Sequence, residues 1–112
     1  MSYRGNYKKR DEKYLMEQVL SLIPDEHCGT SSKDIANVIG ISSRDVRYIV
    51  QKLRDEGYPI CATPAYGYWM ARYSSEMNDT ILKLQAHIDS CEYTLYSLKI
   101  AQNSLEDKEK GL

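Results

Sequence analysis

Residues 43 to 51 carry cationic, hydroxyl and amide side chains at a spacing that would place them together on one side of a helix. Val46, Val50 and Leu53 recur at helical intervals and would face a hydrophobic core. The opposite face would then present Ser43, Arg44, Arg47, Tyr48 and Gln51. An Arg guanidinium can bridge the two acceptors of a guanine edge, and a Gln amide can do the same with adenine. These residue types at this spacing therefore predict hydrogen bonding to bases in duplex DNA.

Neighbouring residues offer contacts to the phosphate backbone. Ser42 and Ser43 lie where the backbone N–H groups at the start of the helix suit a phosphate. Lys52 and Arg54 follow near the far end, whereas helix capping alone explains Asp45. An ordinary solvent-exposed helix face is the alternative interpretation, because Arg and Gln are common on such faces. The motif around these residues favours contact with DNA.

The chain on either side of the turn at Gly40 has the pattern of a helix-turn-helix. Residues 32–51 indicate two short helices, in which Ala36 permits close approach and Gly40 allows a left-handed exit from the first helix. Ser42 and Asp45 have the spacing of a capping box that starts the second helix. The shared core would consist of Ile35, Ile39, Val46, Ile49 and Val50. In such motifs the second helix is usually the one presented to DNA.

The flanking sequence predicts a further helix and a β-hairpin. The predicted helices span about residues 11–23, 32–39 and 43–56, with Pro24 ending the first and Gly57 the third. The loop at residues 25–30 has room for a very short strand. Two strand candidates at residues 58–63 and 68–73 flank a turn that contains Pro64 and Gly67. A hairpin directly after a helix-turn-helix is the wing of a winged helix.

With these features the chain resembles the winged helix-turn-helix superfamily, in the form of the N-terminal DNA-binding domain of the biotin-operon repressor type. The residues that carry the resemblance are the Gly-Tyr-Pro-Ile segment at 57–60 and Gly67, Tyr68 and Met70. It covers roughly residues 11–73 and implies a mainly α, winged helix fold that binds DNA. The chain departs from this pattern at the wing tip, residues 63–67, which carries no Lys or Arg. Tyr66 remains there to pack on sugar or backbone, or on a protein.

A heptad stripe predicts that a final helix, starting at Ser74 or Ser75, associates with a second copy. The stripe consists of Met77, Ile81, Leu84, Ile88, Cys91, Leu95, Leu98, Gln102 and Leu105. Mostly Ile at position a and Leu at position d fits a two-stranded coiled coil, and Gln102 would help to fix its register. The alternatives are a tail that folds back as a hairpin or packs along its own winged helix.

A second apolar stripe lies off this seam. It consists of Leu82, Ala86, Tyr93, Tyr96 and Ile100. A simple dimer would leave it exposed. It would therefore pack on the winged domain, extend the assembly beyond a dimer or bind another protein.

Charge and length divide the chain into regions. We expect a basic arm at residues 1–10, a winged helix-turn-helix domain at 11–73, an oligomerisation helix at 74–106 and a charged tail at 107–112. Up to residue 73 the chain has eleven Lys and Arg against nine Asp and Glu, and from residue 74 it has four against seven. This mild asymmetry argues against tight non-specific DNA binding but is compatible with sequence-specific binding.

The remaining chemistry argues against other classes of function. Three Cys without framework spacing indicate reduced thiols in a cytoplasmic protein, and no segment has the apolar run of a signal peptide or membrane span. His27, Cys28 and Cys61 lack the spacing of a metal site, so we expect no metal and no cofactor. We find no nucleophile elbow, phosphate-binding glycine loop or paired acidic motif, and therefore expect no enzyme.

These observations together predict a dimeric or higher-order regulator of transcription, of bacterial or phage type, that binds a repeated or palindromic duplex site. Small proteins with this domain and a helical tail also resemble products of phages or mobile elements. The alternative is a winged helix that binds protein, as in replication or host-takeover factors. The uncharged wing and the many Tyr support that alternative. An origin-binding protein that recruits a helicase would combine both roles.

Overall fold

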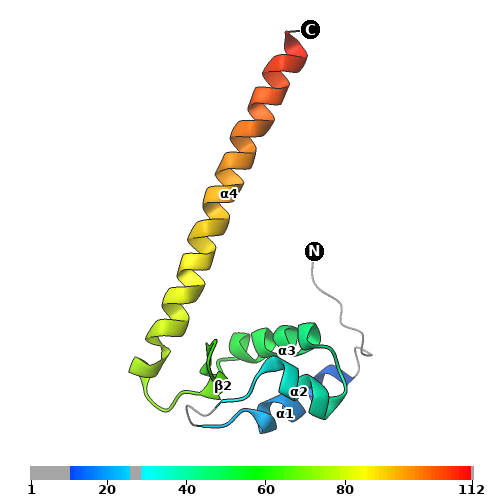
Figure 1. Cartoon of the computed structure of the whole chain (residues 1–112), viewed down its shortest axis with the longest axis vertical. Coiled ribbons are helices and arrows are strands. Elements are labelled where there is room, and N and C mark those ends of the chain that lie inside the picture. Colours follow the sequence, from blue (N-terminus) through cyan, green and yellow to red (C-terminus); the bar gives the residue numbers. More distant parts are fainter. Residues whose placement is uncertain (1–10, 26–28, 112) are drawn as a thin grey trace. The chain divides into compact units, whose positions relative to one another are not determined.

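The computed structural model describes residues 11–25 and 29–111. It consists of two compact units, Met1–Asn78 and Asp79–Leu112 (Figure 1). The first holds α1 (Glu12–Leu22), α2 (Ser32–Ile39), α3 (Ser43–Asp55), β1 (Ile60–Thr63), β2 (Gly67–Met70) and η2 (Ser74–Met77). The second consists of α4 (Asn78–Lys110), which begins one residue before the boundary. Among the described residues, no helix is both long and apolar enough to span a membrane.

Local side-chain signals start and stop the helices of the turn motif. The Ser31 hydroxyl accepts a hydrogen bond from the backbone N–H of Asp34 at 3.0 Å, and Ser42 does the same for Asp45. Each bond satisfies an N–H that has no partner inside the helix. Gly40 ends α2 with a φ of 85°, a conformation that a residue with a Cβ adopts only with strain. The predicted helix-turn-helix, including both starts and the glycine exit, is confirmed.

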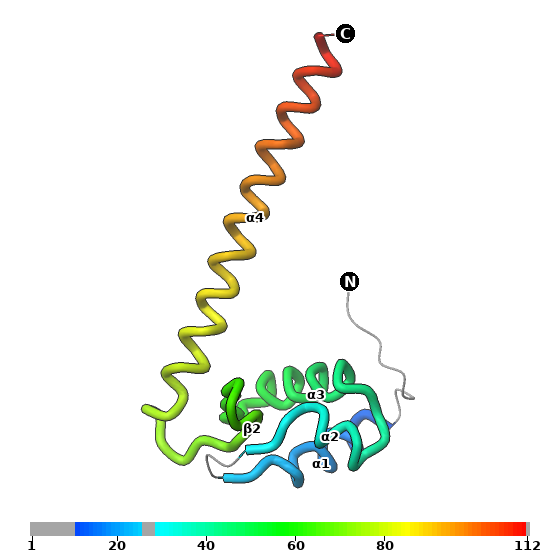
Figure 2. The backbone as a smooth tube through the Cα atoms, in the orientation of Figure 1, coloured from blue at the N-terminus to red at the C-terminus, as the bar shows by residue number. Residues whose placement is uncertain are grey.

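The hydrophobic core of the first unit is built around α3, which packs on α1, α2 and β1 (Figure 2). The helix α3 contributes Val46, Ile49, Val50 and Leu53 to this core, and each of these side chains is at most 2% exposed. The other two helices complete the core. α2 contributes Ile35 and Ala36, and α1 contributes Leu15 and Val19. This dense burial fixes the orientation of α3, and so decides which of its side chains face solvent.

The two strands form an antiparallel hairpin in the position expected for a wing. Its register runs from Ile60 opposite Met70 to Thr63 opposite Gly67. The expected very short strand at residues 25–30 is a single bridge, in which Thr30 and Tyr68 exchange backbone hydrogen bonds of 2.9 and 2.7 Å. Residues 26–28, including His27 and Cys28, lie outside the described part of the chain.

Several predicted boundaries were wrong. The first strand, expected from Tyr58, begins at Ile60, and the final helix, expected to end at residue 106, continues to Lys110. The second strand, expected to reach Tyr73, ends at Met70. The Ala71 N–H still bonds to the Pro59 carbonyl opposite it, but Pro59 has no N–H to return the bond, and the Met70 N–H bonds outside the hairpin to the Pro24 carbonyl. The final helix, expected from Ser74 or Ser75, begins at Asn78 after the 3₁₀ turn η2. Within that turn a Glu76 carboxylate oxygen accepts a hydrogen bond from the Tyr73 N–H at 3.2 Å.

The helix α4 is exposed along almost its whole length. None of its residues is buried, and only Thr80 is even half-buried. Its apolar side chains, including Ile81, Leu84 and Leu95, are therefore exposed in the single chain. Met77, the first expected seam residue, lies in η2 rather than in α4.

Candidate nucleic-acid interface

The solvent-facing side of α3 carries one continuous row of polar side chains. Arg44, Arg47, Gln51 and Arg54 are all exposed and follow one another at intervals of three or four residues. That spacing keeps them on one face of the helix, opposite the buried Val46, Val50 and Leu53. We call these four residues the recognition row. It brings together three residues that the sequence had assigned to base contacts and adds Arg54.

Arg54 joins the recognition row to the wing. Its Nε donates a hydrogen bond to the carbonyl of Ile60 at 2.9 Å, and its guanidinium lies 6.0 Å from the ring centre of Tyr68. Tyr68 is half-buried, and burial raises the pKa of its phenol while the cations Arg54 and Arg47 oppose that shift. Two arginines and one wing tyrosine therefore share one electrostatic environment where α3 meets β2.

The link between Arg54 and Tyr68 was missed by the sequence analysis. Tyr68 counted there only as part of the resemblance, and Arg54 only as a phosphate contact. The contact depends on the path of the chain after Gly57, and the spacing of hydrophobic residues does not predict that path. The one signal in the sequence was the alternation of side chains along β2. Trp69 is buried on one face of the strand, so Tyr68 and Met70 must both lie on the other face.

Tyr48 and Lys52 lie on the flank of α3 that faces α1. Lys52 Nζ forms an ion pair of 3.0 Å with Glu12 Oε1 and donates to the Tyr48 hydroxyl at 3.5 Å. The hydrogen bond to Glu12, followed by that to Tyr48, raises the pKa of Lys52. Tyr48, expected on the outer face, is half-buried and packs against the core cluster. These two residues therefore lie beside the recognition row and not within it.

The start of α3 and the wing tip hold the other expected contacts. Ser42 and Ser43 are half-buried, and the Ser42 hydroxyl is engaged as the helix cap. Tyr66 is exposed on the wing tip, where its N–H donates to the Thr63 hydroxyl at 3.2 Å. Tyr66 has the largest side chain of the wing tip, residues 63–67, and the tip contains no Lys or Arg that could bind a phosphate.

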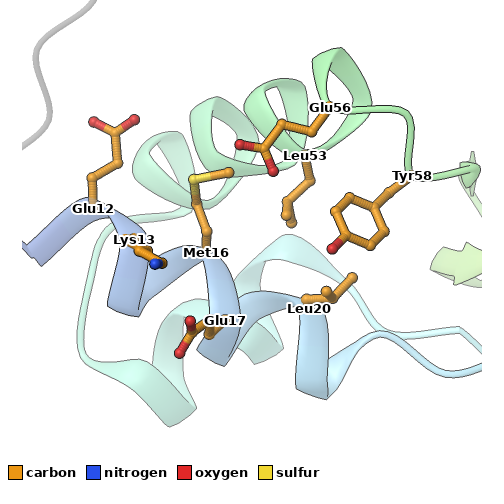
Figure 3. Close-up of a pocket in the computed structure, with 8 residues that line it drawn as sticks. All are labelled: Glu12, Lys13, Met16, Glu17, Leu20, Leu53, Glu56 and Tyr58. Carbon is orange, nitrogen blue, oxygen red and sulfur yellow. The ribbon is translucent and has the colours of Figure 1, made fainter.

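A surface hollow of about 550 Å³ lies between α1 and the end of α3 (Figure 3). Met16, Leu20, Leu53 and Tyr58 supply its apolar surface. The charged side chains around it are Glu12, Lys13, Glu17 and Glu56. Three carboxylates against one ammonium would repel phosphate, so this hollow is unsuited to nucleic acid.

No group of three His, Cys, Asp or Glu side chains able to hold a metal occurs in the described part of the chain. Cys61 is buried, and its Sγ lies 3.6 Å from the Glu76 carbonyl oxygen. His27 and Cys28, which the sequence offered as metal ligands only to be rejected on their spacing, lie outside the described residues.

Comparison with known families gives one match. Residues 18–58 match the family model described as winged helix-turn-helix DNA-binding. No curated protein and no solved structure matched the chain. The matched segment runs from α1 to the residue before Pro59, and the structure adds the β1–β2 hairpin directly after it. Over residues 18–58 the chain is therefore similar to winged helix-turn-helix DNA-binding domains, and the hairpin that follows fits that fold.

Proposed function

We propose that the protein is a sequence-specific regulator of transcription that places α3 in the major groove of duplex DNA. The observation that carries the proposal is the recognition row, exposed on a helix whose opposite face is locked into the core. Arg44, Arg47 and Gln51 would read base edges, since Arg and Gln make bidentate bonds to guanine and adenine. Arg54, held by Ile60 and Tyr68, would sit where α3 meets the wing.

The phosphate contacts would come from the start of α3 and from its flank. The first N–H groups of α3 and the side chains of Ser42 and Ser43 suit a phosphate oxygen. Lys52 would contribute only in part, because Glu12 competes with phosphate for its ammonium. Tyr48 would support Lys52 rather than touch a base, because it is half-buried.

Self-association through α4 is part of the proposal. The seam residues of α4 are Ile81, Leu84, Ile88, Cys91, Leu95, Leu98, Gln102 and Leu105, and Met77 would extend the seam from η2. Apolar side chains exposed at heptad spacing over about four heptads indicate a coiled coil with a second copy. Two winged domains joined in this way would read a repeated or palindromic site.

The test is DNA binding by fluorescence anisotropy, with mixed-sequence duplex at two salt concentrations. On a duplex selected from that mixture for tight binding, the Arg44→Ala/Arg47→Ala variant should lose affinity by roughly 30-fold or more, because each bidentate contact is worth about 1–3 kcal/mol. The matched control, Lys13→Ala/Lys110→Ala, removes the same charge away from the recognition row and should bind almost normally. Circular dichroism checks that both variants fold. Unchanged binding by the Arg variant would refute the assignment of α3.

A second candidate function is the binding of a protein by the winged domain. It is favoured by the wing tip, where the exposed Tyr66 occurs without any cation. A stable complex with one protein that survives nuclease treatment, together with no DNA binding at low salt, would support it. Loss of that complex in Tyr66→Ala would place the contact on the wing.

A further inference from the structure

The helix α4 has a second heptad stripe on the side away from its seam. This second face consists of Leu82, Ala86, Asp89, Tyr93, Tyr96 and Ile100, spaced alternately by four and three residues. At about 100° per residue, its centre lies about 150° around the helix from the seam. All six side chains are exposed, from 49% for Ile100 to 74% for Tyr93 among the large ones. A two-stranded coiled coil through the seam would leave this face uncovered.

Two copies of the second face that run in opposite directions would place complementary side chains opposite one another. If a second α4 runs antiparallel about a level near residue 91, Leu82 meets Ile100 and Ala86 meets Tyr96. The same register places Asp89 opposite Tyr93. The first pair is apolar, the second joins a small residue to a large one, and the third joins an acceptor to a phenol donor. Each pair occurs twice, as a two-fold interface requires.

A parallel pairing of the same face is unfavourable. It would set Asp89 against Asp89 and so bring two carboxylates together. It would also leave a gap where Ala86 meets Ala86. Asp89 already accepts a hydrogen bond from Gln85 at 3.0 Å, which turns its carboxylate along the helix surface without covering it.

We propose that the second face binds another copy of this chain in antiparallel orientation. The occupant is a second copy because the pairs above complement one another in size, polarity and hydrogen bonding. Glu92 would be level with Ser90 of the other chain and within one turn of its Glu92, at the exposed edge of the contact where solvent screens the repulsion. Used together with the seam, this contact yields tetramers or larger assemblies.

The antiparallel contact has a consequence for the winged domains. Each domain is joined to the N-terminal end of its α4, so an antiparallel pair carries its domains at opposite ends. An assembly that used both faces could hold two DNA segments at once. This consequence rests on the proposed function, whereas the contact itself does not.

The first test exchanges side chains across the proposed contact in the full chain, with mass measured by light scattering. Wild type should be larger than a dimer. Ala86→Tyr should weaken the larger assembly at least tenfold by overfilling the space at Tyr96. The double variant Ala86→Tyr/Tyr96→Ala should restore it, because the large and small residues have exchanged places. A wild type that is never larger than a dimer, or a double variant no better than the single one, would overturn the proposal.

The second test reports direction. Chains with Leu82→Cys and chains with Ile100→Cys, both carrying Cys91→Ser, are mixed and oxidised. A disulfide between positions 82 and 100 of different chains is expected, and 82-to-82 linkage would overturn the antiparallel assignment. DNA binding and seam pairing are measured separately, so a failure of this contact is distinguishable from a failure of the proposed function.

Discussion

Lys52 is already engaged within the fold, and the proposed contact with DNA must compete with that engagement. Its ammonium lies 3.0 Å from Glu12 and within reach of Tyr48, on the flank of α3 that faces α1. The sequence places Lys52 near the end of α3, but it holds no sign of the Glu12 partner. That partner comes from a separate helix and is brought close only by packing in the core.

Replacing Glu12 by Gln should therefore strengthen binding to DNA. The change removes the carboxylate that occupies Lys52, so the ammonium becomes available to a phosphate and the salt dependence of log K should steepen by about 0.9. The loss of folding stability should be small, because the pair is partly exposed to solvent. Anisotropy titrations across a salt series measure the slope.

The control for this prediction is Glu17→Gln, which removes one carboxylate from the same helix. It corrects for the change in net charge, because it leaves the ion pair between Glu12 and Lys52 in place. Equal salt slopes in the two variants would show that Lys52 does not reach the DNA backbone.

Elements differ in how far their own sequence determines them. The caps Ser31 and Ser42 and the exit at Gly40 act within a few residues, so the turn motif was predictable from local chemistry. The start of α4 was not, because Ser74 and Ser75 resemble a helix start while the Glu76 carboxylate engages Tyr73 in a tighter turn. Tyr48 was misplaced because a residue at the flank of a helix is buried or exposed according to its neighbours.

The wing is held by a backbone approach that only glycine allows. Gly67 has a φ of 80°, and a Cβ there would collide with the backbone of Thr30 and Ser31. Gly67→Ala should therefore break the Thr30–Tyr68 bridge as well as strain the turn, and lower the free energy of unfolding by about 2 kcal/mol or more. Urea denaturation measures the loss.

Gly40→Ala is the matched control for the wing variant. Gly40 has a similar φ of 85°, but a Cβ there would meet no atom within 4 Å. It should show only the cost of the left-handed backbone, about 1–2 kcal/mol. If the two variants lost equal stability, the close approach of Thr30 to the wing would contribute nothing.

Cys91 reports the direction of the seam in α4. It is exposed, at a d position, with its Sγ 3.8 Å from His87 Nε2. In a parallel, in-register coiled coil the two Cys91 side chains would face each other, so mild oxidation should give a covalent dimer that Cys91→Ser abolishes. Non-reducing gel electrophoresis measures it. An antiparallel seam would separate these sulfurs and give no such dimer.

At the scale of the whole molecule, we expect the two units to have different roles, DNA contact for the first and self-association for the second. The first unit has a core of its own, whereas α4 buries nothing and presents two apolar stripes. The recognition row lies on the first unit and the seam on the second. Affinity for a double site should therefore depend on both units, although no residue of α4 is expected to touch DNA.

Breaking the seam should separate these contributions. Ile88→Asp/Leu95→Asp places charges at two a positions, where a coiled coil would bury them without partners. The variant should lose the seam pairing by light scattering and lose at least tenfold in affinity for DNA with two half-sites, because the second domain no longer binds at high effective concentration. Its affinity for a single half-site should hardly change, since the winged domain is intact.

The matched control, Ser90→Asp/Ser97→Asp, adds the same charge to α4 at positions outside the seam and the second face. It should keep both the seam pairing and the preference for two half-sites. If the seam variant kept that preference as well, the two winged domains would have to be joined by another surface. If both variants lost it equally, added negative charge on α4 would be the cause, and the seam would have no part in DNA recognition.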